Sequence, residues 1–173
     1  MVRRTLIQPL RVSVVLLWLT ISGCGSHPVP LQDHATKVVV IKSEHKLLLL
    51  NGDRVIRTYK VAIGRGGLAP KQRQGDHRTP EGAYIVDRRK INSRFHRALH
   101  VSYPNDADRA RARAAGVDPG GDIMIHGIQN GFGWIGSMHR EVDWTDGCIA
   151  VTDEQIEEIW AAVPDGTPVE IRR

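Results

Sequence analysis

The sequence predicts a mainly β domain with short helices. Short apolar runs rich in Val, Ile and Leu, bounded by Gly, Pro and Asn, follow one another along most of the chain. Segments with a helical spacing of apolar residues are few and short. A length of 173 residues fits one domain with appendages, which is enough to bury a hydrophobic core. We therefore expect one β-rich domain and no second catalytic domain.

The beginning of the chain has the three parts of an export signal. A basic start is followed by an apolar run from Val12 to Ile21 and by small residues before Cys24. This run is too short to span a bilayer comfortably as a mature helix. We expect residues 1–23 to be a signal peptide, residues 24–35 a tether and residues 36–173 the folded domain.

The end of this signal, residues 19–24, resembles the bacterial lipobox, in which the cysteine is acylated and becomes the mature N-terminus. The resemblance implies a lipid anchor on Cys24, since several acyl chains give lasting attachment to a membrane. Ordinary signal cleavage near Gly23 or Gly25 is the alternative. By resemblance to sorting rules in Gram-negative bacteria, Gly25 in place of Asp favours the outer membrane. The expected location is the periplasmic face of the cell envelope.

The folded part begins with the pattern of an antiparallel meander. Apolar runs at 37–41 and 46–50 are separated by polar residues, and an Asn-Gly pair at 51–52 leads into a third run at 55–63. Asn-Gly between apolar runs is the strongest short-range hairpin signal. These runs therefore predict three antiparallel strands.

The middle of the chain predicts a long loop and two short strands. Residues 64–82 are dense in Gly, Pro and charge, which is typical of a surface loop that carries binding residues. Short strands are expected at 83–87 and 99–103, with irregular structure at 92–96.

Capping residues predict two short helices. The first covers residues 105–115, because Asn105 can cap its start, acidic residues follow, and Gly116 ends it. The second begins after Thr152, where Thr and Gln have capping-box spacing ahead of apolar residues at helical spacing. A Pro-Asp-Gly turn ends this helix, and residues 168–171 supply a closing strand.

The charge balance does not indicate a nucleic-acid partner. The formal net charge is +5 at pH 7, but Arg3, Arg4 and Arg11 lie in the expected signal peptide, which leaves +2. Basic clusters at 88–90 and 109–113 are expected to be solvated faces, with an anionic surface or polymer as the alternative partner.

The chain has two cysteines, Cys24 and Cys148. A disulfide between them is the structural alternative to a reactive thiol, and it is disfavoured because Cys24 lies in a processing signal. His96 and His100 stand four residues apart, a spacing that could hold zinc on a helix. The surrounding alternation indicates a strand and no third ligand is obvious, so we expect no metal and no cofactor.

A histidine and a cysteine within residues 122–151 are the candidate catalytic residues. His126 ends an apolar run, which places it at the rim of a sheet, and Cys148 follows a glycine that allows a tight turn and close approach of a substrate. In cysteine nucleophilic catalysis the thiolate attacks while the imidazole removes and returns the proton. The backbone N–H groups of Gly147 and Cys148 are natural donors to an oxyanion. The pair therefore predicts acyl transfer.

Each of the two residues, and the whole chain, also has an alternative interpretation. His126 alone is more often an ordinary strand-end histidine, and Cys148 alone a small buried hydrophobe. A papain-like peptidase would place its cysteine before its histidine, whereas this chain has the reverse order. A non-catalytic envelope-binding lipoprotein would tolerate the loss of Cys148.

The segment His126-Gly127, the spacer 128–144 and Thr145-Asp146-Gly147-Cys148 together resemble the signature of the L,D-transpeptidase (YkuD-like) catalytic domain family. That signature is His, one residue, a spacer of this size, Ser or Thr, His, Gly and Cys. Segments 78–82 and 102–105 also resemble proteobacterial members, and the likeness runs from the opening hairpin to the last strand. It implies a mixed, mainly β sandwich with the nucleophile in a pocket.

The resemblance also implies a substrate and roles for the site residues. The substrate would be a peptidoglycan stem peptide. Cys148 would attack the carbonyl of the third, diamino-acid residue, expel the terminal D-alanine and pass the acyl group to an amine. His126 would act as the base, with its ring held in the useful tautomer by the carbonyl of Gly127.

The chain departs from the family pattern at Asp146, where a second His is common, and at Ala150, where Asn or Arg is frequent. A carboxylate beside Cys148 opposes thiolate formation unless a cation such as Arg140 pairs with it. A branch of the family with Asp at this position includes hydrolases that detach lipoprotein from peptidoglycan. L,D-carboxypeptidase activity or such detachment therefore competes with transfer, and a peptidoglycan-linked lipoprotein is a further expected partner.

Candidate substrate-binding residues surround the two catalytic ones. Trp134 and Trp144 flank the spacer and would form a lid or a sugar-facing wall, or else pack in the core. His139 and Arg140 would touch substrate carboxylates or lie in a solvated loop. We take Arg140, Trp134 and Asp146 as the candidates.

Overall fold

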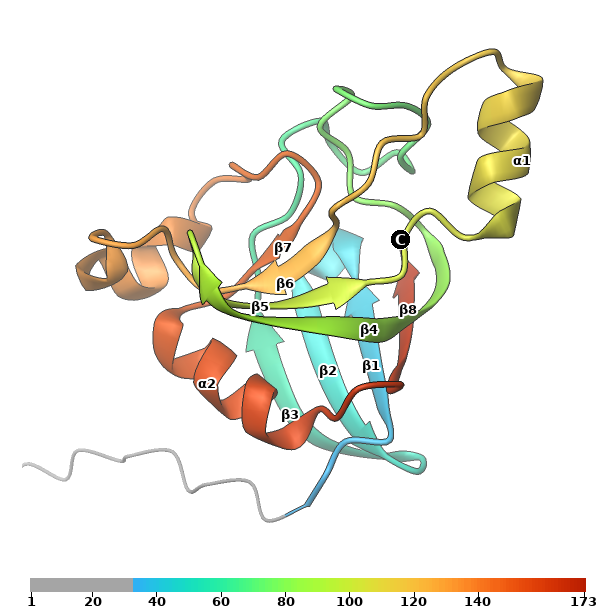
Figure 1. Ribbon diagram of the computed structural model, residues 1–173. Coiled ribbons are helices and arrows are strands. Elements are labelled where there is room, and N and C mark those ends of the chain that lie inside the picture. Colours follow the sequence, from blue (N-terminus) through green and yellow to red (C-terminus); the bar gives the residue numbers. More distant parts are fainter. Residues whose placement is uncertain (1–32) are drawn as a thin grey trace, which may run out of the picture.

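The computed structural model describes residues 33–173 (Figure 1). The expected signal peptide, the expected lipidated Cys24 and most of the tether lie outside the described residues. Ala35, at the end of the expected tether, is buried, and its N–H donates to the carbonyl of Ala162 at 2.8 Å. Within the described part, no helix has the length and apolar character needed to cross a membrane.

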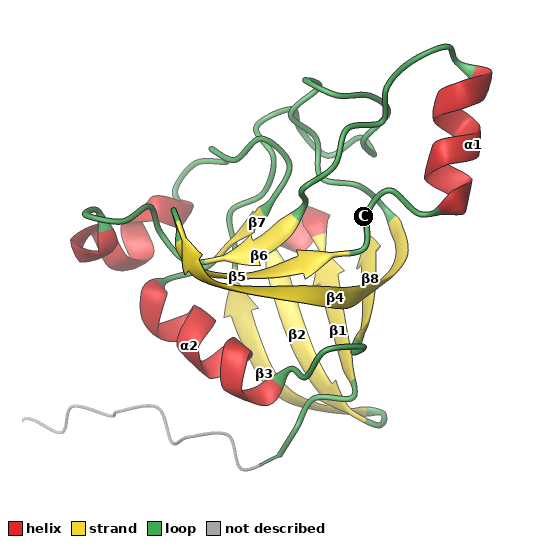
Figure 2. Ribbon diagram, in the orientation of Figure 1, coloured by secondary structure: helices red, strands yellow, loops and turns green. Residues whose placement is uncertain are grey.

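Eight strands of the described part form one mixed sheet in the order β3-β2-β1-β8-β4-β5-β6-β7 (Figure 2). All neighbours are antiparallel except the pairs β1 with β8 and β6 with β7. The predicted fold class, mainly β with short helices in a mixed arrangement, is confirmed. The strands are β1 Lys37–Ile41, β2 Lys46–Asn51, β3 Arg54–Lys60, β4 Gly82–Ser93, β5 His96–Val101, β6 Met124–His126, β7 Ile149–Ala150 and β8 Pro168–Arg172.

The opening meander has the predicted form. Strand β1 pairs antiparallel with β2, and β2 with β3, with Gly52 in a left-handed conformation at the turn (φ 58°). Three consecutive valines of β1 are buried. Because successive side chains point to opposite faces of a strand, both faces of β1 are buried at these positions.

Strand β4 is longer than the sequence predicts. It covers 12 residues, where a short strand at 83–87 and irregular structure at 92–96 were expected. Its first part pairs with β8 and its second with β5, and an irregularity lies between Val86 and Arg88. The second part was missed because three consecutive charged side chains at 88–90, two of them exposed, hide its alternation.

The bend at β4 makes one sheet into two facing layers. In Figure 1, β4 to β7 cross in front of β1 to β3. Val38 and Leu47 of the first layer belong to the same buried cluster as Leu99 and Ile125 of the second. An isolated bridge between Ala62 and Ala150 links the chain after β3 to β7. One continuous core therefore lies between the layers.

Two α-helices and two 3-10 segments complete the described part. The first helix, α1 Asp106–Ala114, begins at a capping box of Asn105 and Asp108. The second, α2 Asp153–Ala162, begins at a capping box of Thr152 and Gln155 and contacts β5 and β6. Both helices are confirmed to within about a residue. The 3-10 segments η1 Lys42–Glu44 and η2 Gly133–Arg140 were not predicted, because segments of this kind are short and leave little periodic pattern.

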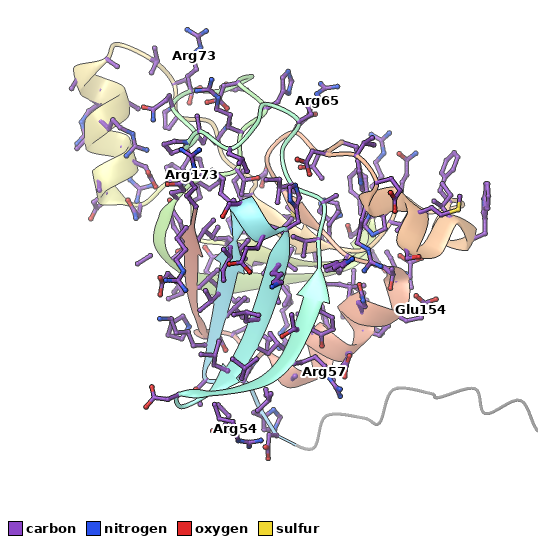
Figure 3. All side chains as sticks on the ribbon, turned by 180° about the vertical axis from the view of Figure 1, so that it is seen from behind. Arg54, Arg57, Arg65, Arg73, Glu154 and Arg173 are labelled. Atoms are coloured by element: carbon purple, nitrogen blue, oxygen red, sulfur yellow. The ribbon has the colours of Figure 1, made fainter. Side chains whose placement is uncertain are left out.

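The long loops gather at one end of the sheet. Figure 2 shows the loops before β4, before β6 and before β7 at the same end of the molecule. Arg65, in the loop before β4, lies at that end, whereas Arg54 lies at the opposite end (Figure 3). Binding residues from distant parts of the sequence can therefore meet there.

Candidate active site

The pairing of β6 with β7 brings His126 and Cys148 together. These short strands are parallel, with Ile125 opposite Ile149 and His126 opposite Ala150. Side chains alternate between the faces of a strand, so Cys148, two residues before Ala150, faces the same side as His126. The predicted position of His126 at the end of a strand is confirmed.

Both residues line one pocket of about 290 Å³ at the loop end of the sheet. The pocket combines groups from five segments of the chain, with polar and aromatic side chains around the thiol. Its lining residues are Arg65, Arg94, Phe95, His126, Gln129, Trp144, Thr145, Asp146 and Cys148.

The imidazole of His126 is neutral and has a fixed tautomer. The ring is 3% exposed, and its Nδ1 lies 2.7 Å from the carbonyl oxygen of Gly127. A carbonyl only accepts, so Nδ1 carries the proton and Nε2 has a lone pair. Burial lowers the pKa of His126 to about 4, although the bond to Gly127 acts in the other direction. The residue is therefore a base at neutral pH.

Aromatic rings hold His126 in place. The ring centroid of Phe95 lies 4.5 Å from that of His126, and the centroid of Trp144 lies 5.8 Å away in an edge-to-face arrangement. The indole N–H of Trp144 donates to Nδ1 of His139 at 3.3 Å, which fixes the orientation of the indole.

The thiol of Cys148 is protonated at rest. Burial raises its pKa to about 11; the backbone N–H of Met124 acts against this shift, while the carboxylates of Asp146 and Asp122 add to it. The Sγ atom also lies 3.5 Å from the carbonyl oxygen of Asp122, which can accept the thiol proton in a weak hydrogen bond. A neutral thiol needs a base in order to react, and Nε2 of His126 carries a lone pair in the same pocket.

A glycine turn presents Cys148 to the pocket. Gly147 has φ of 127°, and a Cβ built on it would lie 2.7 Å from the carbonyl oxygen of Arg78. Its N–H donates to the hydroxyl of Thr145 at 3.2 Å, and that hydroxyl donates to the carbonyl of Cys148 at 2.7 Å. If the N–H of Gly147 donates to an oxyanion, as predicted, it must therefore give up its hydrogen bond to Thr145 and donate to the substrate instead.

Asp146 is the exposed member of the site, with 74% of its side chain accessible. Its carboxylate accepts from Arg65 at 2.9 Å and lies 2.8 Å from Nδ1 of His77, both in the loop before β4. Arg140, considered as a possible cation for this carboxylate, instead donates to the carbonyl of Lys60 and the side chain of Gln155.

Comparison with known proteins agrees with this geometry. The model of the L,D-transpeptidase catalytic domain family (YkuD) matches residues 35–171. The chain belongs to this family.

Individual relatives are consistent with that membership. YafK of Escherichia coli (strain K12), named as a candidate L,D-transpeptidase, is 35% identical over 112 residues, which is 64% of this chain and 38% of that protein. The chain thus spans well under half the length of the curated relatives it matches.

Solved structures share the fold. The helical cell shape determining protein Pgp2 from Campylobacter jejuni aligns with a TM-score of 0.61 and 24% identity, over 82% of this chain and 49% of that one. The L,D-transpeptidase of Xylanimonas cellulosilytica aligns with a TM-score of 0.55 and 19% identity, over 84% of this chain and 64% of that one.

Other predicted residues of this family member are placed differently. Trp144 lines the pocket, as one interpretation expected, whereas Trp134 is 79% exposed and is not among the lining residues. His139 is only 8% exposed, so the expectation of a solvated loop residue was wrong. Arg140 is not among the lining residues either, and its substrate-binding role remains a prediction without support from this geometry.

Sequence reasoning missed several residues that line the pocket or contact its members. Phe95 and Arg94 fell in a segment expected to be irregular, and Arg65 and His77 in a loop marked only as a place where binding residues occur. The sequence signal was general, because a Gly-rich loop indicates exposure but not which side chain it faces.

The two histidines considered for zinc have separate partners. His96 lies 2.7 Å from a carboxylate oxygen of Glu157, and His100 lies 2.5 Å from one of Asp87. They lie on strand β5, as the alternation indicated. Among the described residues, no three His, Cys, Asp or Glu side chains form a group that could hold a metal ion.

Proposed function

We propose that this protein is a cysteine-dependent acyltransferase that acts on the third-residue carbonyl of peptidoglycan stem peptides. Membership of the L,D-transpeptidase family supports the reaction class. One observation carries the mechanism: the Nδ1 proton of His126 is committed to Gly127, which leaves Nε2 as the base in the pocket that also contains the neutral thiol of Cys148.

Acylation then follows from these two groups. As Sγ of Cys148 attacks the carbonyl carbon, Nε2 of His126 takes the thiol proton, and a tetrahedral oxyanion forms. When the carbon–nitrogen bond breaks, the departing amine of D-alanine takes the proton back from the imidazolium. A thioester on Cys148 remains. The backbone N–H groups of Cys148 and Gly147 are the proposed oxyanion donors.

The acceptor decides the outcome of the second half-reaction. An amine that loses a proton to His126 attacks the thioester and gives a new cross-link, whereas water gives hydrolysis. L,D-carboxypeptidase activity, or detachment of a lipoprotein from peptidoglycan, would use the same acyl-enzyme. We propose transfer as the main reaction. The structural neighbour Pgp2 is named as a helical cell shape determining protein, and by analogy we propose that this protein also acts on cell shape.

We further propose that the protein works at the periplasmic face of the envelope, attached through lipid on Cys24. The sequence pattern at residues 19–24 supports this location.

The test is incubation of the purified protein with tetrapeptide-bearing peptidoglycan fragments, followed by mass analysis. Loss of D-alanine together with a new cross-link supports transfer, and loss alone indicates a carboxypeptidase. Activity only on lipoprotein-linked material indicates the detaching hydrolase. The Cys148→Ala variant should form no product and no covalent adduct of the acyl-fragment mass. Turnover retained by that variant would contradict the cysteine mechanism.

A further inference from the structure

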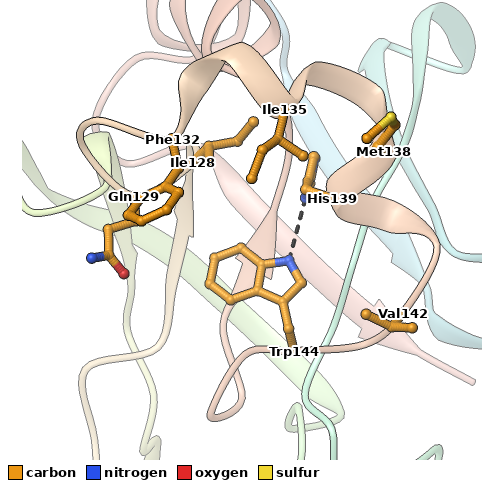
Figure 4. Close-up of a pocket in the computed structure, with 8 residues that line it drawn as sticks. All are labelled: Ile128, Gln129, Phe132, Ile135, Met138, His139, Val142 and Trp144. Atoms are coloured by element: carbon orange, nitrogen blue, oxygen red, sulfur yellow. Dashed lines mark hydrogen bonds between the residues drawn. The ribbon is translucent and has the colours of Figure 1, made fainter.

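A second pocket lies beside the pocket of Cys148. It has a volume of about 290 Å³ and is formed mainly by η2 and its flanking residues (Figure 4). Gln129 and Trp144 line both pockets, so the two spaces are neighbours with the indole in the wall of each. Its lining residues are Ile128, Gln129, Phe132, Ile135, Met138, His139, Val142 and Trp144.

The second pocket offers few polar contacts to a ligand. Nδ1 of His139 accepts the indole N–H of Trp144, as the dashed line in Figure 4 shows, so these two polar groups satisfy each other. Burial lowers the pKa of His139 to about 4, so the ring is uncharged at neutral pH. Its Nε2 is buried and has no partner within the described part of the chain. Apart from these rings, Gln129 is the one polar side chain in the lining.

Large apolar side chains at this pocket face solvent. Phe132 is 44% exposed, Met138 64% and Val142 66%. Scattered single exposures are ordinary, but these three lie together around one cavity. A gathered apolar surface around a cavity is typical of a binding site.

We propose that this second pocket is a subsite for one large apolar side chain of a peptide. That peptide is either already joined to the acyl group on Cys148 or receives the acyl group from Cys148. The inference rests on the proposed function. Because Trp144 and Gln129 line both pockets, we infer that the occupant belongs to a molecule that also reaches the thiol.

The chemistry of the pocket selects this occupant among the alternatives. A D-alanine methyl group is too small to fill the cavity. A sugar ring would bury hydroxyl groups, which need hydrogen-bond partners that this lining does not supply. A Leu, Phe or Tyr side chain fits both the apolar lining and the aromatic wall of Phe132 and Trp144. We therefore infer that the ligand extends beyond the D-alanine of the stem peptide. It is a longer peptide that carries a bulky apolar residue near the reacting amide.

Binding measurements test the subsite without turnover. The Cys148→Ala protein is titrated by calorimetry with Gly-Gly-Gly amide and with three peptides that carry Phe at the first, second or third position. One Phe peptide should bind at least about tenfold more tightly than the glycine peptide, since burying such a side chain is favourable by this order. Equal affinity, including no measurable binding by any peptide, would overturn the inference. So would tighter binding of a disaccharide fragment in competition with the Phe peptide.

Matched variants assign the effect to the pocket. Val142→Trp, combined with Cys148→Ala, fills the cavity from an exposed position, and it should remove the preference for Phe. Val55→Trp makes the same change at an exposed valine of β3, remote from the pocket, and it should keep the preference. If both variants bind alike, the second pocket is not the subsite.

Active protein separates this inference from the proposed function. The ratio of kcat/KM for acceptor peptides with Phe and with Gly should be about ten, and Val142→Trp should reduce it to about one. A Phe preference in binding with no acyl transfer or hydrolysis would sink the proposed function but keep the subsite. Turnover with a ratio of one in the unsubstituted protein would keep the function and sink the subsite.

Discussion

The two side chains proposed to be catalytic are held by different kinds of structure. His126 is surrounded by Phe95, Trp144 and the carbonyl of Gly127, and it is almost fully buried. Packing fixes its ring, and the same burial lowers its pKa to about 4. The base is therefore defined by apolar contacts that salt does not screen.

Cys148, by contrast, lies on a turn held by backbone and by exposed charges. Gly147 lets the turn approach the carbonyl of Arg78, and Asp146 joins it to Arg65 and His77. Exposed ion pairs are weak and sensitive to ionic strength. Substitution of His126 should therefore lower the reaction rate most. Substitution of the charged residues beside Cys148 should change the rate only modestly.

Among substitutions that keep Cys148, the largest effect is expected from His126→Gln. Without Nε2 as a base, the thiol of Cys148 stays protonated, and kcat/KM for D-alanine release should fall by roughly 10² to 10⁴-fold. His34→Gln, at an exposed position outside the pocket, serves as the control and should keep full activity. If His126→Gln retained more than a tenth of the activity while folding normally, the assignment of the base would be wrong.

Gly147→Ala should come next, because it disturbs the geometry of the nucleophile itself. A Cβ would lie 2.7 Å from the carbonyl oxygen of Arg78, at a φ of 127° that side chains rarely adopt. We expect strain of about 1–3 kcal/mol and a loss of roughly 10²-fold in kcat/KM from misplacement of Sγ. Thermal unfolding and D-alanine release measure the two effects.

The control for this change is Gly166→Ala. Gly166 also has positive φ, at 85°, but a Cβ there meets nothing within 4 Å. Its substitution should cost about 1–2 kcal/mol of stability with activity unchanged. Equal activity losses in the two variants would show that strain anywhere in the fold, and not the turn at Cys148, is responsible.

Local signals in the sequence predict much of this fold. Asn-Gly at 51–52 predicted the hairpin of β2 and β3, and the capping residues Asn105 and Thr152 predicted both helices. The apolar run that ends at His126 predicted this residue at the end of a strand, which is β6. Each of these features depends on residues close together in the chain.

Features that depend on distant pairing were not predictable in the same way. The second half of β4 is a strand because β5 pairs with it, although its own side chains are mostly charged and exposed. The contact of Phe95 with His126 and the pairing of Arg65 with Asp146 likewise arise from register between remote segments. A single sequence shows which residues can act, but not which remote side chain faces them.

The pH dependence of kcat/KM tests the buried character of the base. Burial lowers the pKa of His126 to about 4, so the neutral, basic form is present above that pH and is lost as the pH falls through it. Between pH 7 and pH 5, kcat/KM should fall by less than about twofold. A histidine with its ordinary pKa near 6.5 would instead give a fall of roughly 25-fold over this interval. An acid limb centred near pH 6.5 in D-alanine release would therefore contradict the burial argument.

The smallest effect is expected at Asp146. Its carboxylate raises the pKa of Cys148, but it is exposed and paired with Arg65 and His77, so its field is partly offset. Asp146→Asn removes one negative charge and leaves Arg65 unopposed, so alkylation of Cys148 by iodoacetamide at pH 8 should become about two- to fivefold faster. Arg65→Gln should change the rate in the opposite direction, and high salt should shrink both differences. A slower reaction in Asp146→Asn would mean that the charges at this turn hold Cys148 in place more than they adjust its ionisation.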